Sequence, residues 1–294
     1  MNTKDSWDLG ELFRELRIAR GLKLKDVASD KLSVSQLSKF ENGQTMLSSD
    51  KLLVAISGIH MSFSEFGYAL NNYQKSDFFK LGERIAELHS KQDVDSLKEL
   101  LVTYKRYESF DVYNRLNLIV IKVAIHSLDN SYLITEEDKE FLTNYLYEIE
   151  AWTEYELYIF GNTMSILSDS DLIFLGKAFE ERSKLYSSLT SHKRSAEIAF
   201  LNLILILMER HEVYYVRYFV LKLEEILNYQ DMFAITCLHI LKQVADYLNG
   251  DIKSIEQIED EIDMIERLGN PITASFLRIN LQQFLLLKKL LNST

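Results

Sequence analysis

The sequence of 294 residues has little proline, glycine or cysteine: it contains one proline, ten glycines and a single cysteine, Cys237. With so few turn-forming residues, and no Asn-Gly or Asp-Gly pair between alternating apolar runs, β-hairpins are not expected and an all-α fold is predicted. One cysteine cannot form an internal disulfide or a multi-cysteine metal site, which fits a reducing compartment. Apolar residues make up 47% of the chain, enough to bury the cores of two domains.

Long apolar runs are lacking too, and no leader segment is expected. The longest apolar stretch, residues 203–208, is far shorter than the roughly 20 residues that a membrane-spanning helix needs. The N-terminus does not begin with a basic and then an apolar segment. We therefore expect a cytoplasmic protein without a membrane partner.

Catalytic and cofactor motifs are likewise missing. The six histidines are scattered, and none belongs to a His-Glu-x-x-His pattern. There is neither a glycine-rich phosphate loop nor a Gly-x-Ser-x-Gly elbow. Neither enzyme activity nor a metal or other cofactor is expected.

Positive charge is scarce overall but is concentrated near the N-terminus. The net charge is −11, yet residues 1–70 hold nine Lys and Arg against nine Asp and Glu, so the whole excess of acid lies in residues 71–294. Residues 14–39 carry seven cations and three anions, a net charge of +4. An acidic protein with one basic segment is expected to contact DNA through that segment only.

The sequence does contain, within residues 33–43, a short helix with both of its ends marked. Ser33 stands at an N-cap position, and Gly43 stands where a C′ glycine can reverse the chain. Leu37 and Phe40 form its apolar side. The other side offers hydrogen-bonding groups and one cation that suit base edges and phosphate oxygens, namely Ser35, Gln36, Ser38 and Lys39.

Two predicted helices precede this one. Residues 9–20 have an amphipathic pattern, and residues 24–29 form a second, short helix. This order is that of a helix-turn-helix, and the stretch resembles the helix-turn-helix of the phage-repressor class. The resemblance implies that residues 33–42 are the recognition helix and that Arg17 and Glu41 form a structural ion pair.

The side chains expected to contact promoter DNA come from this helix and from the cations before it. They are Arg14, Arg20, Lys23, Ser33, Ser35, Gln36, Ser38, Lys39 and Asn42. The alternative is a repressor-like domain that docks only protein.

The chain is expected to divide into a five-helix helix-turn-helix domain at residues 1–70, a connecting helix at 71–92 and a helical repeat domain at 93–294. In the repeat domain similar segments recur around Asn117, Asn162, Asn202, His239 and Asn280, at spacings of 45, 40, 37 and 41 residues. A period near 40 fits one helix pair per repeat. The pattern predicts a tetratricopeptide-like solenoid of five pairs, at residues 93–128, 132–166, 169–209, 211–248 and 251–292.

Two segments carry a resemblance to a known family. The pattern Ser-x-Ser-Gln-Leu-Ser-Lys-Phe-Glu-x-Gly at residues 33–43, and Tyr155-Glu156-Leu157 through Phe160-Gly161-Asn162, resemble the Rgg/GadR/MutR family of Gram-positive transcriptional regulators. The resemblance implies a homodimer that binds promoter DNA and, as in quorum sensing, a short peptide pheromone in the concave face of its repeats. Some members link their DNA-binding domains by a disulfide. Residues 1–70 contain no cysteine, so such a contact is expected to be noncovalent here.

Polar residues of the repeats are the candidate contacts for a peptide. A side-chain amide both donates and accepts, so a row of amides along a groove can pair with the backbone of an extended peptide. Equally, each amide can satisfy a neighbouring helix end. The candidate peptide-binding residues are Arg84, Asn117, Asn162, Asn202, Arg217, His239 and Asn280.

The last predicted helix is apolar on more than one face, which favours a homodimer formed through the C-terminal helices. Together these patterns predict a sequence-specific transcription regulator controlled by a short apolar peptide, with RNA polymerase as a further candidate partner. Two alternatives stay open. One is a regulator whose repeat domain only dimerises or docks a protein partner, and the other is a peptide-binding adaptor without DNA binding.

Overall fold

The computed structural model describes residues 6–104, 111–251 and 254–291. In these residues every regular element is a helix, apart from one isolated bridge between Ser29 and Leu32, which confirms the all-α prediction. The chain divides into two compact units, residues 1–83 and 84–294. No helix of the described residues is both long enough and apolar enough to cross a bilayer.

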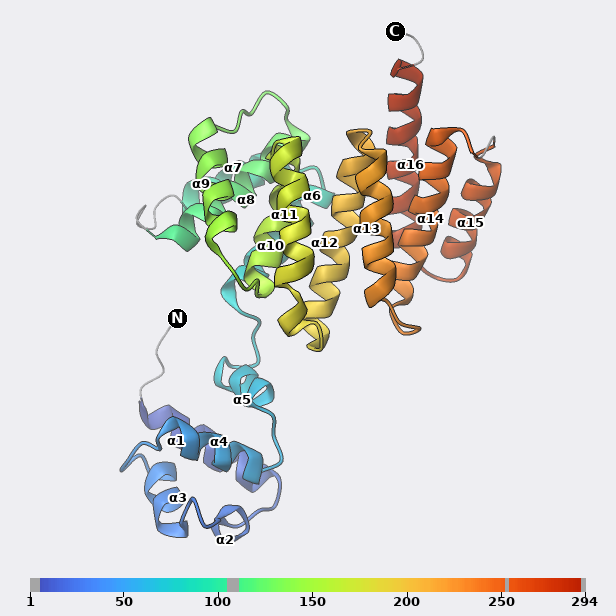
Figure 1. Cartoon of the computed structure of the whole chain (residues 1–294). Helices are drawn as coiled ribbons and strands as arrows, with labels where there is room; N and C mark the ends of the chain where they lie inside the picture. Colours follow the sequence, from blue (N-terminus) through green and yellow to red (C-terminus); the bar gives the residue numbers. More distant parts are fainter. Residues whose placement is uncertain (1–5, 105–110, 252–253, 292–294) are drawn as a thin grey trace. The chain divides into compact units, whose positions relative to one another are not determined.

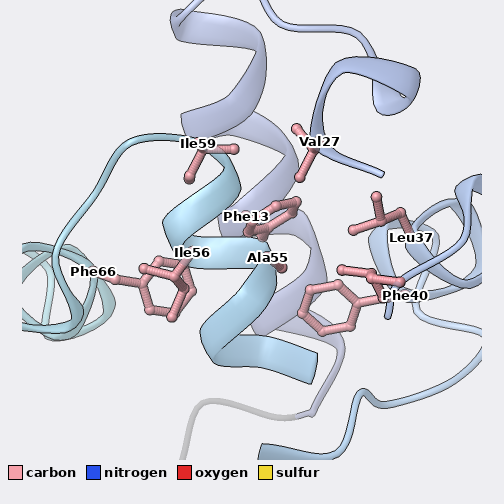
Figure 2. Close-up of a cluster of buried hydrophobic side chains, with 9 residues drawn as sticks. Phe13, Val27, Leu37, Phe40, Ala55, Ile56, Ile59 and Phe66 are labelled. Carbon is pink, nitrogen blue, oxygen red and sulfur yellow. The ribbon is translucent and has the colours of Figure 1, made fainter. Parts of the chain in front are cut away.

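The first unit contains five short helices and the start of a sixth (Figure 1). The five are α1 (Ser6–Ala19), α2 (Leu24–Val27), α3 (Val34–Glu41), α4 (Ser49–Gly58) and α5 (Phe63–Leu70). Their apolar faces meet in one core, drawn in Figure 2, which includes Phe13, Val27, Leu37, Phe40, Ala55, Ile56, Ile59 and Phe66. Since α2 and α3 are only four and eight residues long, their positions depend on this shared core rather than on helix propensity.

Local signals set the ends of α3. The Ser33 hydroxyl accepts a hydrogen bond from the backbone N–H of Gln36, and the Gln36 side chain returns a contact to the Ser33 backbone, a complete capping box. Gly43 has φ of 67°, the left-handed conformation that a C′ position requires. The helix therefore begins and ends at the residues that the sequence pattern marks.

The second unit is a stack of helix pairs. The boundary between the units falls inside α6 (Asp77–Ser90), whose Leu81, Ile85 and Leu88 are buried. The pairs are α7 (Val94–Tyr104) with α8 (Val112–Leu128), α9 (Glu136–Glu148) with α10 (Glu154–Thr163), α11 (Asp169–Arg182) with α12 (Thr190–Glu209), α13 (Val213–Ile226) with α14 (Met232–Asn249), and α15 (Glu256–Arg267) with α16 (Pro271–Leu291). Single 3₁₀ turns follow α10 (Met164–Ile166) and α11 (Lys184–Tyr186).

The second helix of each pair packs against the second helix of the next. Contacts run from α8 to α10, on to α12, to α14 and finally to α16, so these five helices form one continuous row, called here the even row. Buried aromatic rings bind the middle of the stack together: the ring centres of Phe160 and Phe179 are 5.9 Å apart, and those of Phe179 and Phe200 are 4.4 Å apart. Each repeat thus buries its apolar face against its neighbours, as in a tetratricopeptide-like solenoid.

Candidate functional site

A buried ion pair fixes the first helix against the third. Nε and Nη2 of Arg17 each donate to a different carboxylate oxygen of Glu41 at 2.6 Å, and the third nitrogen donates to the carbonyl of Leu22 at 2.5 Å. Arg17 is 7% exposed and Glu41 6%. The hydrogen bonds that Arg17 donates to Glu41 raise the pKa of the Arg17 guanidinium, so Arg17 stays charged. A bidentate pair of this kind sets the register of α3 on α1 rather than contacting DNA.

Gly10 sets the distance between the same two helices. A β-carbon built on Gly10 would collide with the backbone carbonyl of Phe40. Only glycine therefore lets α1 approach the backbone of α3 this closely. Gly10 was absent from the residues singled out in the sequence, although a glycine inside an amphipathic helical pattern is a recognisable signal of close approach.

The outer face of α3 presents small polar groups to solvent. Ser35, Lys39 and Asn42 are exposed, and Gln36 and Ser38 are half-buried. Both side-chain amides of this face have partners in α3 or at its caps. Oε1 of Gln36 accepts from the backbone nitrogen of Ser33 at 3.1 Å, and Nδ2 of Asn42 donates to the carbonyl of Ser38 at 2.8 Å. To contact a base through its oxygen, Gln36 must first leave the capping box.

The candidate cations outside α3 lie on α1, just after it and just before α2. Arg14, Arg20 and Lys23 are all exposed, and Nη1 of Arg20 donates to the carbonyl of Leu16 at 3.1 Å. Among the described residues, no side-chain nitrogen of these three lies within 4.0 Å of a carboxylate, although the backbone nitrogen of Lys23 donates to Asp26 at 2.7 Å. Their side-chain charges are therefore available to phosphates. Arg17 differs from them because Glu41 already neutralises it.

In the second unit, four asparagines singled out in the sequence lie on four of the five helices of the even row, α8, α10, α12 and α16. Two of them join neighbouring helices: Asn202 on α12 donates to the carbonyl of Gly161 on α10 at 3.3 Å, and the hydroxyl of Tyr155 donates to Oδ1 of Asn117 on α8 at 3.4 Å. These amides therefore contribute to the packing of the row, one of the two roles weighed from the sequence.

The other two asparagines bond within their own helices. Nδ2 of Asn162 donates to the carbonyl of Tyr158 at 2.7 Å, and Nδ2 of Asn280 donates to the carbonyl of Phe276 at 2.8 Å. Asn162 is exposed, whereas Thr163 beside it is buried. Adjacent residues on a helix point about 100° apart, so Thr163 can face the core while the amide of Asn162 faces solvent. The side-chain oxygen of Asn162 remains able to accept a hydrogen bond.

The remaining candidates differ in how occupied they are. Arg84 forms an exposed ion pair with Glu87 at 2.8 Å, and Nε2 of His239 lies 2.9 Å from a carboxylate oxygen of Glu261. These partners reduce the availability of both side chains for a ligand. Arg217, by contrast, is exposed and has no carboxylate within 4.0 Å in the part of the chain that the structure describes.

A family model described as the C-terminal domain of the helix-turn-helix type transcriptional regulator Rgg matches residues 97–278, more than half of the chain. The chain belongs to the Rgg family. Its family is thus one of transcriptional regulators rather than a class of enzymes.

Solved structures share the fold of this Rgg-family chain along nearly its whole length. A protein of Listeria monocytogenes EGD-e assigned as a transcriptional regulator has 22% identity and a TM-score of 0.79, with 94% of this chain and 97% of that chain covered. The SHP pheromone receptor Rgg2 of Streptococcus dysgalactiae has 20% identity and a TM-score of 0.74, with 94% and 99% covered. PrgX in complex with cCF10 has 14% identity and a TM-score of 0.68, with 95% and 92% covered. At these identities the likeness concerns the fold.

One further surface of this Rgg-family chain lies on α16. Leu277, Leu281 and Phe284 are buried in the stack. Large apolar side chains also line the solvent side of the same helix at heptad-like spacing, and they are Ile272, Phe276, Ile279 and Leu286. The terminal helix is therefore apolar toward the core and toward solvent, as its sequence pattern predicts.

No group of three or more His, Cys, Asp or Glu side chains within the described residues is arranged to hold a metal ion. The lone Cys237 is buried in α14, and burial raises the pKa of its thiol to about 12. Its thiolate is therefore scarce near neutral pH, and Cys237 is better explained as a packing residue than as a ligand or nucleophile.

Proposed function

We propose that this Rgg-family chain is a homodimeric, sequence-specific DNA-binding regulator of transcription controlled by a short apolar signalling peptide. In this proposal the outer face of α3 reads promoter DNA and the even row of the second unit binds the peptide. The observation that carries the DNA-binding half is the α3 surface: a capped helix with exposed Ser35 and Lys39, held to α1 by a buried bidentate ion pair. The exposed cations of α1 and of the turn before α2 have no side-chain ion pair among the described residues and can add phosphate contacts.

Two substitutions test the placement of DNA on α3. Gln36→Ala removes an amide suited to a base edge and is expected to cost about 1–3 kcal/mol of operator binding, with relaxed discrimination at one base pair. Because Gln36 also completes the capping box of α3, helix content must be checked in the same variant. Arg14→Ala is expected to weaken binding to every sequence and to reduce the salt slope by about 1.

Footprinting on the DNA upstream of the gene supplies the operator, and fluorescence anisotropy on the protected fragment supplies the affinities. If Gln36→Ala bound the operator as tightly and as selectively as the wild type, α3 would not be the recognition helix. Absence of any protected fragment would favour the alternative, a peptide-binding adaptor without DNA binding.

The peptide-binding half is supported by the even row and by the relatives. Asn117, Asn162, Asn202 and Asn280 lie on four of its five helices, and side-chain amides suit the backbone of an extended peptide. Structures of the same fold include a pheromone receptor and a complex of PrgX with cCF10. To regulate, the peptide must bind one arrangement of the protein more tightly than another, since equal affinity shifts no equilibrium.

A thermal-shift screen of short apolar peptides against the full chain tests this half. Ligands that bind only the folded state raise its melting temperature in a concentration-dependent way. The alternative is a regulator whose repeat domain only dimerises or docks a protein partner such as RNA polymerase. Such a protein would bind DNA, but no peptide would raise its melting temperature.

The exposed apolar stripe on α16 supports dimerisation through the C-terminal helices. Side chains at this spacing on one solvent-facing side suit burial against a second copy. Ile279→Glu places a charge in the middle of the stripe while leaving the buried Leu277 and Leu281 in place, and it is expected to give a folded monomer. Light scattering that shows a dimer for this variant would move the interface elsewhere.

A further inference from the structure

A cavity of about 180 Å³ lies in the second unit, where the ends of α12 and α14 meet the start of α13 and the C-terminal part of α16. Its apolar wall includes Met208, Val216 and Leu248, and its polar groups include Arg217, Glu212 and Lys288. Concave sites with an apolar wall and a few converging polar groups are the usual form of small-ligand sites.

Arg217 is the group that gives this cavity a preference for an anion. Its guanidinium has no carboxylate within 4.0 Å among the described residues, whereas Arg115 and Arg210 of the same unit are both paired in this way. An exposed, unpaired guanidinium at the edge of an apolar cavity is suited to bidentate binding of a carboxylate.

Lys288 adds a second fixed cation. Its Nζ donates to the carbonyl of Tyr247 at 2.7 Å and lies 4.0 Å from the centre of the Tyr247 ring, and no carboxylate of the described residues pairs with it. Glu212 is the one acidic residue of the lining, and it stands at the N-cap of α13. These three side chains carry a net charge of +1, which one monoanion balances.

We propose that this cavity binds a carboxylate carried on a short branched apolar group. The carboxylate pairs with Arg217, and the apolar group lies against Met208, Val216 and Leu248. The volume is about six times the ~30 Å³ that a water molecule occupies in the liquid and is below the roughly 300–1,000 Å³ of drug-sized sites. It suits a ligand of about eight heavy atoms, such as the carboxylate, α-carbon and side chain of a C-terminal leucine.

Two sources offer this chemistry. One is the C-terminal residue of the peptide in the proposed function, and this source rests on that function. Met208 follows Asn202 by six residues on α12, about 9 Å along the helix axis, a distance that about three extended peptide residues span. The other source is a free short-chain acid with a branched end, which is independent of the proposed function.

The test measures the binding of three probes to the full chain by ligand-observed NMR titration. The probes are N-acetyl-leucine, its C-terminal amide and 4-methylpentanoate. Arg217→Met removes the guanidinium and keeps an apolar stem. Arg267→Met is the matched control, because Arg267 is also exposed and unpaired among the described residues but lies on α15, away from this cavity. Melting temperatures check that both variants remain folded.

We expect N-acetyl-leucine to bind at least tenfold more tightly than its amide, and Arg217→Met to abolish that preference while Arg267→Met preserves it. If 4-methylpentanoate binds with the same dependence on Arg217, the site is assigned to free acids. If N-acetyl-leucine binds and 4-methylpentanoate does not, the site is assigned to a peptide terminus. Equal binding of acid and amide, no dependence on Arg217, or no binding of any probe would overturn the proposal.

The outcomes also separate this site from the proposed function. A peptide that shifts the melting temperature equally as the acid and as the C-terminal amide would overturn the carboxylate site alone. Arg217-dependent binding of 4-methylpentanoate, with no response to any peptide, would overturn the peptide-regulated function alone.

Discussion

Replacing Glu41 with Leu is the sharpest test of how the recognition helix is held. The change leaves the Arg17 guanidinium in its buried position and removes the carboxylate to which it donates two hydrogen bonds of 2.6 Å. Removing one partner of a buried pair costs about 3–5 kcal/mol, because the other charge stays buried and uncompensated. A unit of this size has a free energy of unfolding of about 4–12 kcal/mol, so the loss takes a large share of it.

The double variant Arg17→Met with Glu41→Leu should recover most of this loss. Apolar side chains of similar volume can replace a buried pair at little cost when both charges are removed together. The exposed pair of Lys75 and Glu83 in the same unit is the matched control, and Lys75→Ala should cost less than about 1 kcal/mol.

Hydrogen exchange followed by mass spectrometry measures the effect in α1 and α3 separately from the second unit. A loss of 3 kcal/mol lowers the protection of these helices more than 100-fold, since each 1.4 kcal/mol is a factor of ten. The reasoning fails if Glu41→Leu behaves like Lys75→Ala, or if the double variant is no more stable than the single one.

Three further predictions concern close packing, the peptide and pH. Gly10→Ala should displace α3 and weaken operator binding at least tenfold in an anisotropy titration, whereas Gly67→Ala, where an added β-carbon meets nothing within 4 Å, should not; equal affinities would show that α1 and α3 can separate freely. In calorimetry, Asn162→Ala should cost about 1–3 kcal/mol of peptide binding, without changing the melting temperature or the affinity for DNA in the absence of peptide. Asn202→Ala should lower both peptide affinity and melting temperature, because its amide also joins α12 to α10. Wild-type peptide affinity in both variants would place the ligand elsewhere. His192 is 1% exposed, and burial lowers the pKa of its ring, so the neutral ring favours folding. This contribution to stability is complete above the ordinary histidine pKa of about 6.5 and is lost as pH falls below that value. The difference in melting temperature between wild type and His192→Gln should therefore shrink from pH 7.5 to pH 5, and a constant difference would contradict this account.

Much of the first unit follows from local signals in the sequence. Ser33 and Gly43 mark the ends of α3 because capping depends on residues within one helical turn. The contact of Arg17 with Glu41 could be expected because the resemblance to a known helix-turn-helix supplied the long-range pairing that spacing alone does not give. The repeat period near 40 likewise predicted five helix pairs, since each pair is a local unit that recurs along the chain.

Other features were decided only by the tertiary structure. The sequence marks Gln36 and Asn162 as polar, but it does not show that the oxygen of Gln36 lies in the capping box or that Asn162 faces solvent. The role of Gly10 depends on the carbonyl of Phe40, thirty residues away, and the cavity beside Arg217 depends on four helices that meet at their ends. Helix starts and stops are short-range properties and can be read from neighbouring residues, whereas the exposure of a side chain, the approach of two backbones and the shape of a cavity depend on contacts between residues distant in the sequence.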